Sequence, residues 1–295
     1  MKLAGVRIRN LIESLPYIQK FRGKTFVIKF GGSILKKPAA REAFIQDIVL
    51  LSLVGIHPVI VHGGGNEISM KLEKLKIPTR FIEGLRVTDS ESMKEVEMIL
   101  SGSINKDLVM GLQNAGAKSI GISGKDGGLL KATKHELTVD GKSVDIGFVG
   151  EIETIDIQIV KDLIALEYIP VIAPIGFDDN GQSYNINADT AAAAISWSLG
   201  AEKLILMTDV DGLYLDFNDK STLKTALTIG EGKELLGNGT IQGGMRPKIQ
   251  CALDAMENGT NSVHLINGTQ EHSMLLEVFT DEGIGTMIKK ERNNP

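Results

Sequence analysis

Two lysines in this sequence stand at positions where a cation is costly unless an anion meets it. Lys29 lies inside the apolar run FVIKFGG, and a lysine in a buried strand needs a negatively charged partner. Lys248 follows Gly-Gly-Met-Arg-Pro at the predicted start of a helix, where a cation opposes the helix dipole. Both positions predict contact with an anion, either a bound phosphate or the partner in a structural ion pair.

A second group of polar residues opens an alanine-rich predicted helix in the string YNINADTAAAAI. Asp189 falls in the first turn, and Asn187 is suited to cap it. Alternatively, Asn185, Asn187 and Asp189 could hold a polar substrate and orient the lysines. Arg86 lies in the apolar stretch GLRVT, and arginine is the residue suited to a bidentate grip on a carboxylate.

Glycine is unusually frequent, with 33 residues where about 21 would be expected at an ordinary frequency of roughly 7%. Glycine allows backbone N–H groups to approach an anion closely, and a following helix N-terminus adds its positive dipole. Several glycine-rich strings at one sheet edge predict a phosphate site, although any single string also suits an ordinary strand-to-helix turn. The strings are KFGGS, HGGG, ISGKDGG and QGGM.

The familiar phosphate and hydrolase motifs do not match. Gly23-Lys24-Thr25 lacks the upstream glycine of a Walker loop, because Ile18 stands there, and no GxGxxG opens the first helix. HGGG also occurs as an oxyanion loop in esterases, but the chain has no GxSxG nucleophile elbow. The histidines have no metal-ligand spacing, and we interpret His62 as a turn residue rather than a base. We expect no metal site built from protein residues.

Strands and helices that would position these residues alternate along the chain. Short apolar runs predict buried strands of a parallel sheet at 26–30, 58–61, 119–122, 169–173 and 203–207. Apolar spacings of three and four predict helices at 39–53, 91–114, 157–166, 189–199 and 247–258. This alternation favours an open α/β sandwich with right-handed crossovers. Two β-hairpins are expected, turning at Asp140-Gly141 and at Asp179-Asn180-Gly181.

Composition narrows the class of protein. The 295 residues carry 37 acidic and 32 basic side chains, and the net charge of −5 argues against general nucleic-acid binding. Cys251 is the only cysteine, which excludes an internal disulfide and suits a reducing cytoplasm. No apolar run reaches the length of about 18 residues that a membrane span needs. We therefore expect a cytoplasmic protein with neither nucleic-acid nor membrane partners.

The first twenty residues predict an amphipathic helix that Pro16 would kink or break. Leu11, Ile12, Leu15 and Ile18 fall on one apolar stripe. Such a stripe needs an apolar surface to cover, either on its own lobe or on another subunit.

Taken together, a set of strings in order from residue 26 to 288 resembles the amino-acid kinase family, most closely its branch that phosphorylates N-acetyl-L-glutamate. The strings are KFGGS, VIVHGGG, GLRVTD, INKDLV, GISGKDGG, GFVGE, YNINADTAAAAI, LMTDVDGLY, GGMRPKI and DEGIGTMI. The resemblance implies an α/β fold, a three-layer αβα sandwich around an open, mainly parallel sheet, with two lobes. It implies an N-terminal kinked helix over 1–22, an amino-acid-binding lobe over 23–200 and an ATP-binding lobe over 201–295.

The resemblance also implies a reaction, the ATP-dependent phosphorylation of the side-chain carboxylate of N-acetyl-L-glutamate in arginine biosynthesis. Lys29 would stabilise the transferring phosphoryl group, Lys248 would bind on the leaving-nucleotide side, and Asp189 would hold both lysines. Mg²⁺ would arrive bound to ATP. The residues matching the substrate-binding pattern are Gly64, Gly65, Arg86 and Asn185, and those matching the phosphate-binding pattern are Gly31 and Gly32.

Regulation is a further implication, because the N-terminal helix resembles the arginine-inhibited members. In those members the helix links dimers into a hexamer, a trimer of dimers, and L-arginine sits between the helix and the C-terminal lobe. The residues matching that pattern are Tyr17, His264, Glu282 and Gly285. An alternative is a catalytically silent arginine sensor of the same fold, although intact Lys29, Asp189 and Lys248 count against it.

Overall fold

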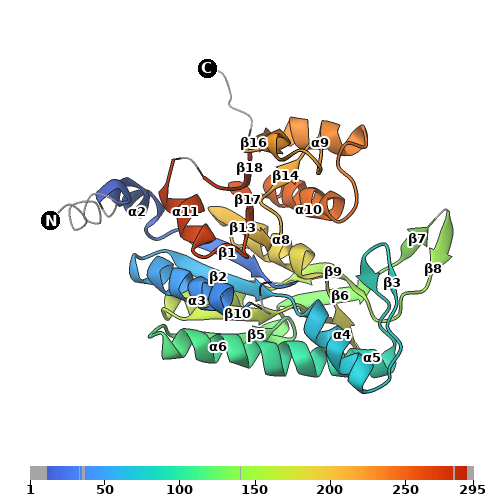
Figure 1. The fold of residues 1–295 in the computed structure, drawn as a ribbon. Helices are drawn as coiled ribbons and strands as arrows, with labels where there is room; N and C mark the ends of the chain where they lie inside the picture. The colour runs from blue at the N-terminus through green and yellow to red at the C-terminus, as the bar shows by residue number, and fades with distance from the viewer. Residues whose placement is uncertain (1–11, 33, 35–36, 140, 282, 291–295) are drawn as a thin grey trace.

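An eight-stranded, mainly parallel sheet organises the computed structural model, which describes residues 12–32, 34, 37–139, 141–281 and 283–290 (Figure 1). The strand order is β16-β18-β17-β13-β1-β2-β10-β5, and β17 and β18 form its antiparallel pair. All five predicted strands are confirmed. The strands are β1 (Thr25–Phe30), β2 (His57–His62), β5 (Ser119–Ser123), β10 (Ile169–Ala173), β13 (Lys203–Thr208), β16 (Ala226–Thr228), β17 (Ser262–Asn267) and β18 (Thr286–Lys289).

Helices cover both faces of this sheet, as Figure 1 shows, so the predicted three-layer αβα sandwich is confirmed. Phe26 and Ile28 of β1 pack in one core with α3, α6 and α11, whereas Val27 packs in a second core with α8 and α10. This is the alternation that a strand imposes. The helices are α2 (Leu15–Phe21), α3 (Pro38–Leu53), α4 (Gly65–Lys74), α5 (Ser90–Glu97), α6 (Asn105–Asn114), α7 (Gln158–Ala165), α8 (Ala188–Ser198), α9 (Ile229–Gly237), α10 (Met245–Glu257) and α11 (Ser273–Phe279).

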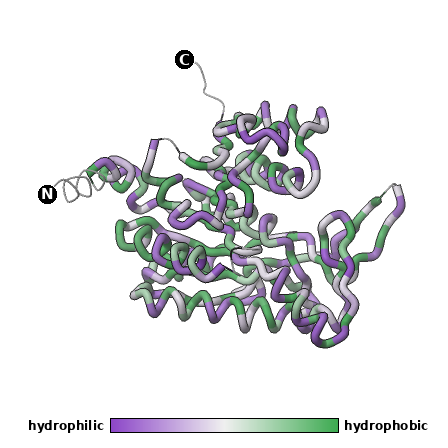
Figure 2. Tube along the Cα trace, in the orientation of Figure 1, coloured by the Kyte–Doolittle hydropathy of each residue, from purple (hydrophilic) through white to green (hydrophobic). Residues whose placement is uncertain are grey.

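The single helix predicted over 91–114 is wrong in its middle. A π-helix, η2 (Met98–Ile104), separates α5 from α6. A π-turn closes i→i+5 hydrogen bonds and so accommodates an extra residue within a continuous helical path. Hydrophobic and hydrophilic residues nevertheless alternate along α6 as an amphipathic helix requires (Figure 2).

A smaller four-stranded sheet and short hairpins lie beside the main sheet. Both predicted hairpins are confirmed: β7 pairs with β8 around Gly141, and β11 pairs with β12 around Asp179-Asn180-Gly181. Asp140 lies outside the described residues. The additional strands are β3 (Phe81–Ile82), β4 (Leu85–Arg86), β6 (Leu130–Lys134), β7 (Leu137–Val139), β8 (Lys142–Val144), β9 (Gly150–Ile155), β11 (Ile175–Phe177), β12 (Ser183–Asn185), β14 (Leu213–Tyr214) and β15 (Leu223–Lys224).

The predicted N-terminal helix is described only from residue 12 onward. Helix α2 begins at Leu15 with Ser14 as its N-cap residue and Pro16 in its first turn, a position that proline tolerates. Tyr17 and Ile18 pack against the first core, while the side chains of Ile12 and Leu15 are exposed. No helix within the described residues is long and apolar enough to cross a membrane.

Candidate functional site

Asp189 joins the two lysines that the sequence singles out. Its Oδ1 lies 3.0 Å from Nζ of Lys29, and its Oδ2 accepts a hydrogen bond of 2.6 Å from Nζ of Lys248. All three side chains are at least four-fifths buried. The arrangement is one carboxylate between two ammonium groups, which leaves one net positive charge in a partly dehydrated place.

Three elements far apart in the chain bring this triad together. Lys29 shares the strand face of Val27 and therefore points toward α8 and α10. Asp189 lies in the first turn of α8, whose N-cap residue Asn187 accepts hydrogen bonds from the N–H groups of Asp189 and Thr190. Lys248 lies in the first turn of α10, behind Gly244. A cation in a first turn opposes the helix dipole, so Asp189 offsets an unfavourable placement.

The electrostatics keep the Asp189 carboxylate ionised. Burial raises its pKa, but the charges of Lys29 and Lys248 outweigh burial and hold the pKa at about 2. The carboxylate is therefore anionic at neutral pH and holds both ammonium groups in fixed positions.

Two cavities meet at this triad. A smaller cavity of about 250 Å³ is lined by Lys29, Arg86, Asn185 and Asp189 among others. A larger cavity of about 630 Å³ is lined by Lys248 together with Thr208, Asp209, Leu213, Tyr214, Phe217, Ile241 and Met245. The two lysines that share Asp189 thus face different cavities. A group transferred between ligands in the two cavities would pass both cations.

The glycines that follow β1 and β2 lie close together beside the smaller cavity. A β-carbon on Gly31 would lie 3.0 Å from the backbone nitrogen of Gly63, so the two loops touch through their main chains. Gly32 has a φ of +66°, a conformation that favours glycine. Gly32 lines the smaller cavity, as do Gly64 and Gly65, and α4 begins at Gly65. The helix N-terminus and the bare main chain both favour an anion here.

Arg86 lies in the smaller cavity with half of its guanidinium unused. Its Nη2 donates to the carbonyl oxygen of Gly65 and to Oγ of Ser69, each at 2.7 Å. The ring of Phe81, opposite Arg86 in the β3–β4 pair, lies 4.6 Å from the guanidinium carbon. Nη1 is buried and has no hydrogen-bond partner. A buried donor without a partner is costly, and a ligand carboxylate would satisfy it.

Asn185 is tied to the same wall. Its Nδ2 donates to Oγ1 of Thr88 at 3.3 Å, and that hydroxyl donates to the carbonyl oxygen of Arg86 at 2.9 Å. The Asn185 amide is therefore linked to the main chain of Arg86 through one buried threonine. Neither Thr88, Ser69 nor Phe81 was expected from the sequence, although Ser69 follows Gly65 at the i+4 spacing that places two residues on one helix face.

His62 is excluded as a base by its hydrogen bonds. It is fully buried at the end of β2, where Nδ1 contacts the carbonyl oxygen of Gly63 at 3.1 Å and Nε2 contacts Nδ2 of Asn105 at 3.2 Å. Because an amide nitrogen can only donate, Nε2 is the acceptor and the ring is neutral. Burial lowers the pKa of His62 to about 4. Both ring nitrogens are engaged within the protein.

The glycine-rich string ISGKDGG lies away from the two cavities. The glycines of ISGKDGG are absent from the linings of both cavities. A β-carbon on Gly124 would lie 2.4 Å from the carbonyl oxygen of Ile175, and one on Gly127 would lie 2.9 Å from the side chain of Ile159. Gly124 and Gly127 thus permit close packing within the protein, which agrees with the alternative that this string is an ordinary turn. Gly244 of QGGM does line the larger cavity.

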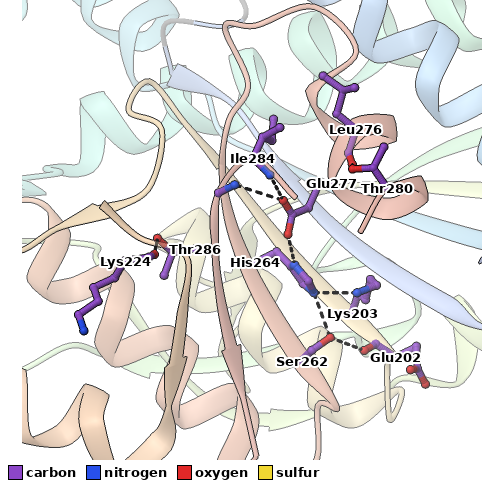
Figure 3. A network of polar contacts seen from close by, with 11 residues as sticks. Glu202, Lys203, Lys224, Ser262, His264, Leu276, Glu277, Thr280, Ile284 and Thr286 are labelled. Atoms are coloured by element: carbon purple, nitrogen blue, oxygen red, sulfur yellow. Dashed lines mark hydrogen bonds and ion pairs between the residues drawn. The ribbon is translucent and has the colours of Figure 1, made fainter. Parts of the chain in front are cut away.

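The residues expected to bind arginine fall into two places. His264 and Gly285 belong to a buried network (Figure 3), in which Glu277 accepts hydrogen bonds from Nδ1 of His264 at 2.6 Å and from the backbone nitrogen of Gly285 at 3.2 Å. Nζ of Lys203 donates to Nε2 of His264 at 2.8 Å, so this ring is also neutral. Burial lowers the pKa of His264 and brings that of Lys203 to about 8.

Tyr17 lies elsewhere, in a cavity of about 840 Å³ between α2 and α11, where its hydroxyl donates to Asp281. His264 and Gly285 do not line that cavity. Glu282 lies outside the described residues. Among the side chains that the structure does describe, no cluster of three or more His, Cys, Asp or Glu residues is arranged to hold a metal ion.

Each of two cavities is lined by one lysine, the two lysines share the carboxylate of Asp189, and glycine loops line the smaller cavity. Such a site suits the transfer of a phosphoryl group. Such a reaction depends on positioning two anions and on stabilising charge that spreads over the transferring oxygens. The chain belongs to the amino acid kinase family, whose model matches residues 24–267.

Particular relatives narrow the comparison. The chain is 51% identical over 281 residues to the acetylglutamate kinase of Thermoanaerobacter pseudethanolicus. This alignment covers 95% of the chain and 92% of that kinase. The N-acetylglutamate synthase of Neisseria gonorrhoeae complexed with coenzyme A and N-acetyl-glutamate is 28% identical, with a TM-score of 0.84 over 96% of this chain. Its complex with coenzyme A and L-arginine has a TM-score of 0.81, 27% identity and the same coverage of this chain. The chain spans only 63% and 65% of the synthase in these two structures.

Proposed function

We propose that this protein phosphorylates the side-chain carboxylate of N-acetyl-L-glutamate with ATP, as a step of arginine biosynthesis. The observation that carries the proposal is the Lys29–Asp189–Lys248 triad at the junction of two cavities. The 51% identity to an acetylglutamate kinase along 95% of the chain supports the choice of substrate.

The proposed roles follow from which cavity each residue lines. Acetylglutamate occupies the smaller cavity, where the free Nη1 of Arg86 and the amide of Asn185 bind it. ATP occupies the larger cavity, whose many apolar and aromatic side chains suit the adenine ring. The smaller cavity is lined mostly by residues of the proposed 23–200 lobe, and the larger one by residues of the proposed 201–295 lobe.

The chemistry needs no general base, because the attacking carboxylate is already ionised at neutral pH. Lys29 stabilises the phosphoryl group in transfer, and Lys248 stabilises the charge that develops on the leaving nucleotide. Gly31, Gly32 and the two glycines after Gly63 supply backbone N–H groups that need no reorganisation during the reaction. Mg²⁺ enters with the nucleotide, because it usually binds through substrate phosphates and few carboxylates.

A coupled assay for ADP release tests this proposal with acetylglutamate, glutamate and aspartate as separate acceptors. We expect turnover with acetylglutamate at least ten-fold above that with the other two. Lys29→Met should abolish turnover while leaving the fold intact by circular dichroism. Absence of turnover together with tight arginine binding would favour the silent sensor instead.

We further propose feedback inhibition by L-arginine, bound between α2 and the C-terminal lobe. In support, the buried Glu277 carboxylate of α11 anchors β17 to the segment around Gly285, α11 packs against α2, and a related synthase has been solved with L-arginine. Tyr17, His264, Glu282 and Gly285 are the proposed site residues. Equal activity with and without millimolar arginine would reject this regulation.

The assembly that we propose is a cytoplasmic hexamer, a trimer of dimers joined through the N-terminal helices over 1–22. Sedimentation of the full chain and of a chain lacking 1–22 tests it. We expect the shortened chain to sediment as a dimer and to lose arginine sensitivity.

A further inference from the structure

The lining of the smaller cavity is divided between polar and apolar side chains. Its polar residues are Lys29, Arg86, Asn185, Asn187 and Asp189, and its larger apolar residues are Ile68, Phe81, Leu85, Leu100, Val149, Pro174 and Ile186. Asp189 is the carboxylate among the residues that line it, and both of its oxygens face lysines. An amino acid with a free α-ammonium group would therefore find no free carboxylate in the lining, whereas an acylated nitrogen carries an apolar group that the apolar lining residues could accept.

One apolar residue of this lining, Leu100, comes from the π-helix. Leu100 lies in η2 (Met98–Ile104), is almost completely buried and lines the cavity. A β-carbon on Gly64 would lie 2.7 Å from Cδ2 of Leu100 and 2.3 Å from Cδ1 of Ile104. The end of Leu100 thus rests on the main chain of the glycine loop that we propose to hold the substrate carboxylate. π-turns inside helices occur frequently at functional sites.

Asn105 fixes the position of the π-helix relative to the glycine loop. It is completely buried directly after η2, and its amide donates to Nε2 of His62 at 3.2 Å and to the carbonyl oxygen of Val171 at 2.8 Å. His62 directly precedes Gly63 in the chain. The π-helix and the glycine loop are therefore joined through a buried hydrogen bond, so Leu100 has a defined position against the cavity.

We propose that Leu100 determines which N-acyl group the substrate carries, by packing against the alkyl end of that group. This inference rests on the proposed function and deepens it, because it assigns a residue to recognition of the acetyl group. The ligand class is a glutamate with a short N-acyl chain. One added or missing methylene in an apolar pocket changes kcat/KM by roughly 10- to 200-fold, so shortening Leu100 should favour a longer acyl chain.

The test compares kcat/KM for N-formyl-, N-acetyl- and N-propionyl-glutamate in the wild type and in Leu100→Ala. We expect the propionyl-to-acetyl ratio to rise at least ten-fold in the variant. Leu112→Ala is the matched control, because Leu112 is an equally buried leucine on α6 that does not line the cavity. If Leu100→Ala does not fold, Leu100→Val carries the same comparison with a smaller expected rise.

Two results would overturn the inference. A ratio in Leu100→Ala within two-fold of the wild-type ratio, with wild-type turnover of acetylglutamate intact, rejects the role of Leu100 and leaves the proposed function standing. An equal change of ratio in Leu112→Ala rejects it also, because the effect would then be a general loss of packing. Failure of the wild type to phosphorylate acetylglutamate at all would instead overturn the proposed function and this inference together.

Discussion

Replacing Asp189 by Asn should expose how strongly the triad depends on one carboxylate. The pKa of Asp189 is about 2 rather than 3.8, and one pKa unit corresponds to 1.36 kcal/mol, so the native state favours the ionised form by about 2 kcal/mol. Removing one member of a buried ion pair costs about 3–5 kcal/mol, because the remaining charge is left unpaired. We therefore expect Asp189→Asn to lower the free energy of unfolding by about 3 kcal/mol at pH 7.

The pH dependence gives this prediction its sign. A carboxylate whose pKa is lowered in the native state stabilises the fold fully above its unfolded pKa, and that stabilisation is lost as the pH falls. The difference between wild type and Asp189→Asn should therefore be constant from pH 7 to pH 5 and should shrink between pH 4 and pH 2. The turnover number should fall at least about 100-fold, since the lysines lose their fixed positions.

Urea denaturation at pH 7, 5 and 3, followed by circular dichroism, measures the stability difference. Asp107→Asn serves as the matched control, because Asp107 has an exposed side chain on α6. An unfolding free energy at pH 7 within 0.5 kcal/mol of the wild type, or a deficit that persists undiminished at pH 3, would refute the electrostatic account of the triad.

Three further outcomes are expected. Gly64→Ala would place a methyl group 2.3 Å from Cδ1 of Ile104, so KM for acetylglutamate should rise at least ten-fold. Gly65→Ala is the control, because its methyl group would meet no atom within 4 Å. An equal rise of KM in Gly65→Ala would contradict the steric reason. Arg86→Lys loses the planar, bidentate donor, so KM should rise about 10- to 100-fold with kcat little changed, and an unchanged KM in steady-state kinetics would contradict the assignment. Burial raises the pKa of Asp47 from 3.8 to about 6, so stability falls as the pH rises from about 4 to 6 and the loss is complete above 6. Asp47→Asn should raise the free energy of unfolding by about 1–3 kcal/mol at pH 8 and by less as the pH falls toward 4. Urea denaturation at pH 8 and pH 4 measures this, and a lower free energy of unfolding in the variant at pH 8 would contradict the prediction.

The two lysines of the triad could be anticipated because each stands where a cation is unfavourable. Lys29 interrupts an apolar strand, and Lys248 stands in a helix first turn where a cation is unfavourable. A charged side chain that conflicts with the local structure predicted by its neighbours can be recognised from the sequence alone. Such conflicts concentrate at functional sites. The strands of the main sheet could also be predicted from the sequence, because buried parallel strands are near-continuous apolar runs.

The π-helix and the partners of Arg86 could not be anticipated in the same way. An apolar spacing of three and four continues through 98–104, so periodicity alone does not separate a π-turn from an α-helix. Phe81 and Ser69 contact Arg86 because the fold brings the β3–β4 pair beside α4. That arrangement depends on the whole fold and not on the residues next to Arg86 in the sequence. The purpose of the glycines in ISGKDGG could not be decided from the sequence for a related reason. A glycine that lets Ile175 or Ile159 approach closely looks the same in the sequence as one that lets a phosphate approach.

The place of β1 in the main sheet has a consequence for how this chain is made. β1 lies between β2 and β13, so one of its neighbours is synthesised soon after it and the other only when Thr208 has emerged. Until then β1 presents an unpaired edge, which invites wrong pairing. Because contacts so distant in the chain form slowly, the nascent protein carries β1 with this one edge unpaired through most of translation. A chaperone that shields such an edge would matter more to this protein than its ordinary size suggests.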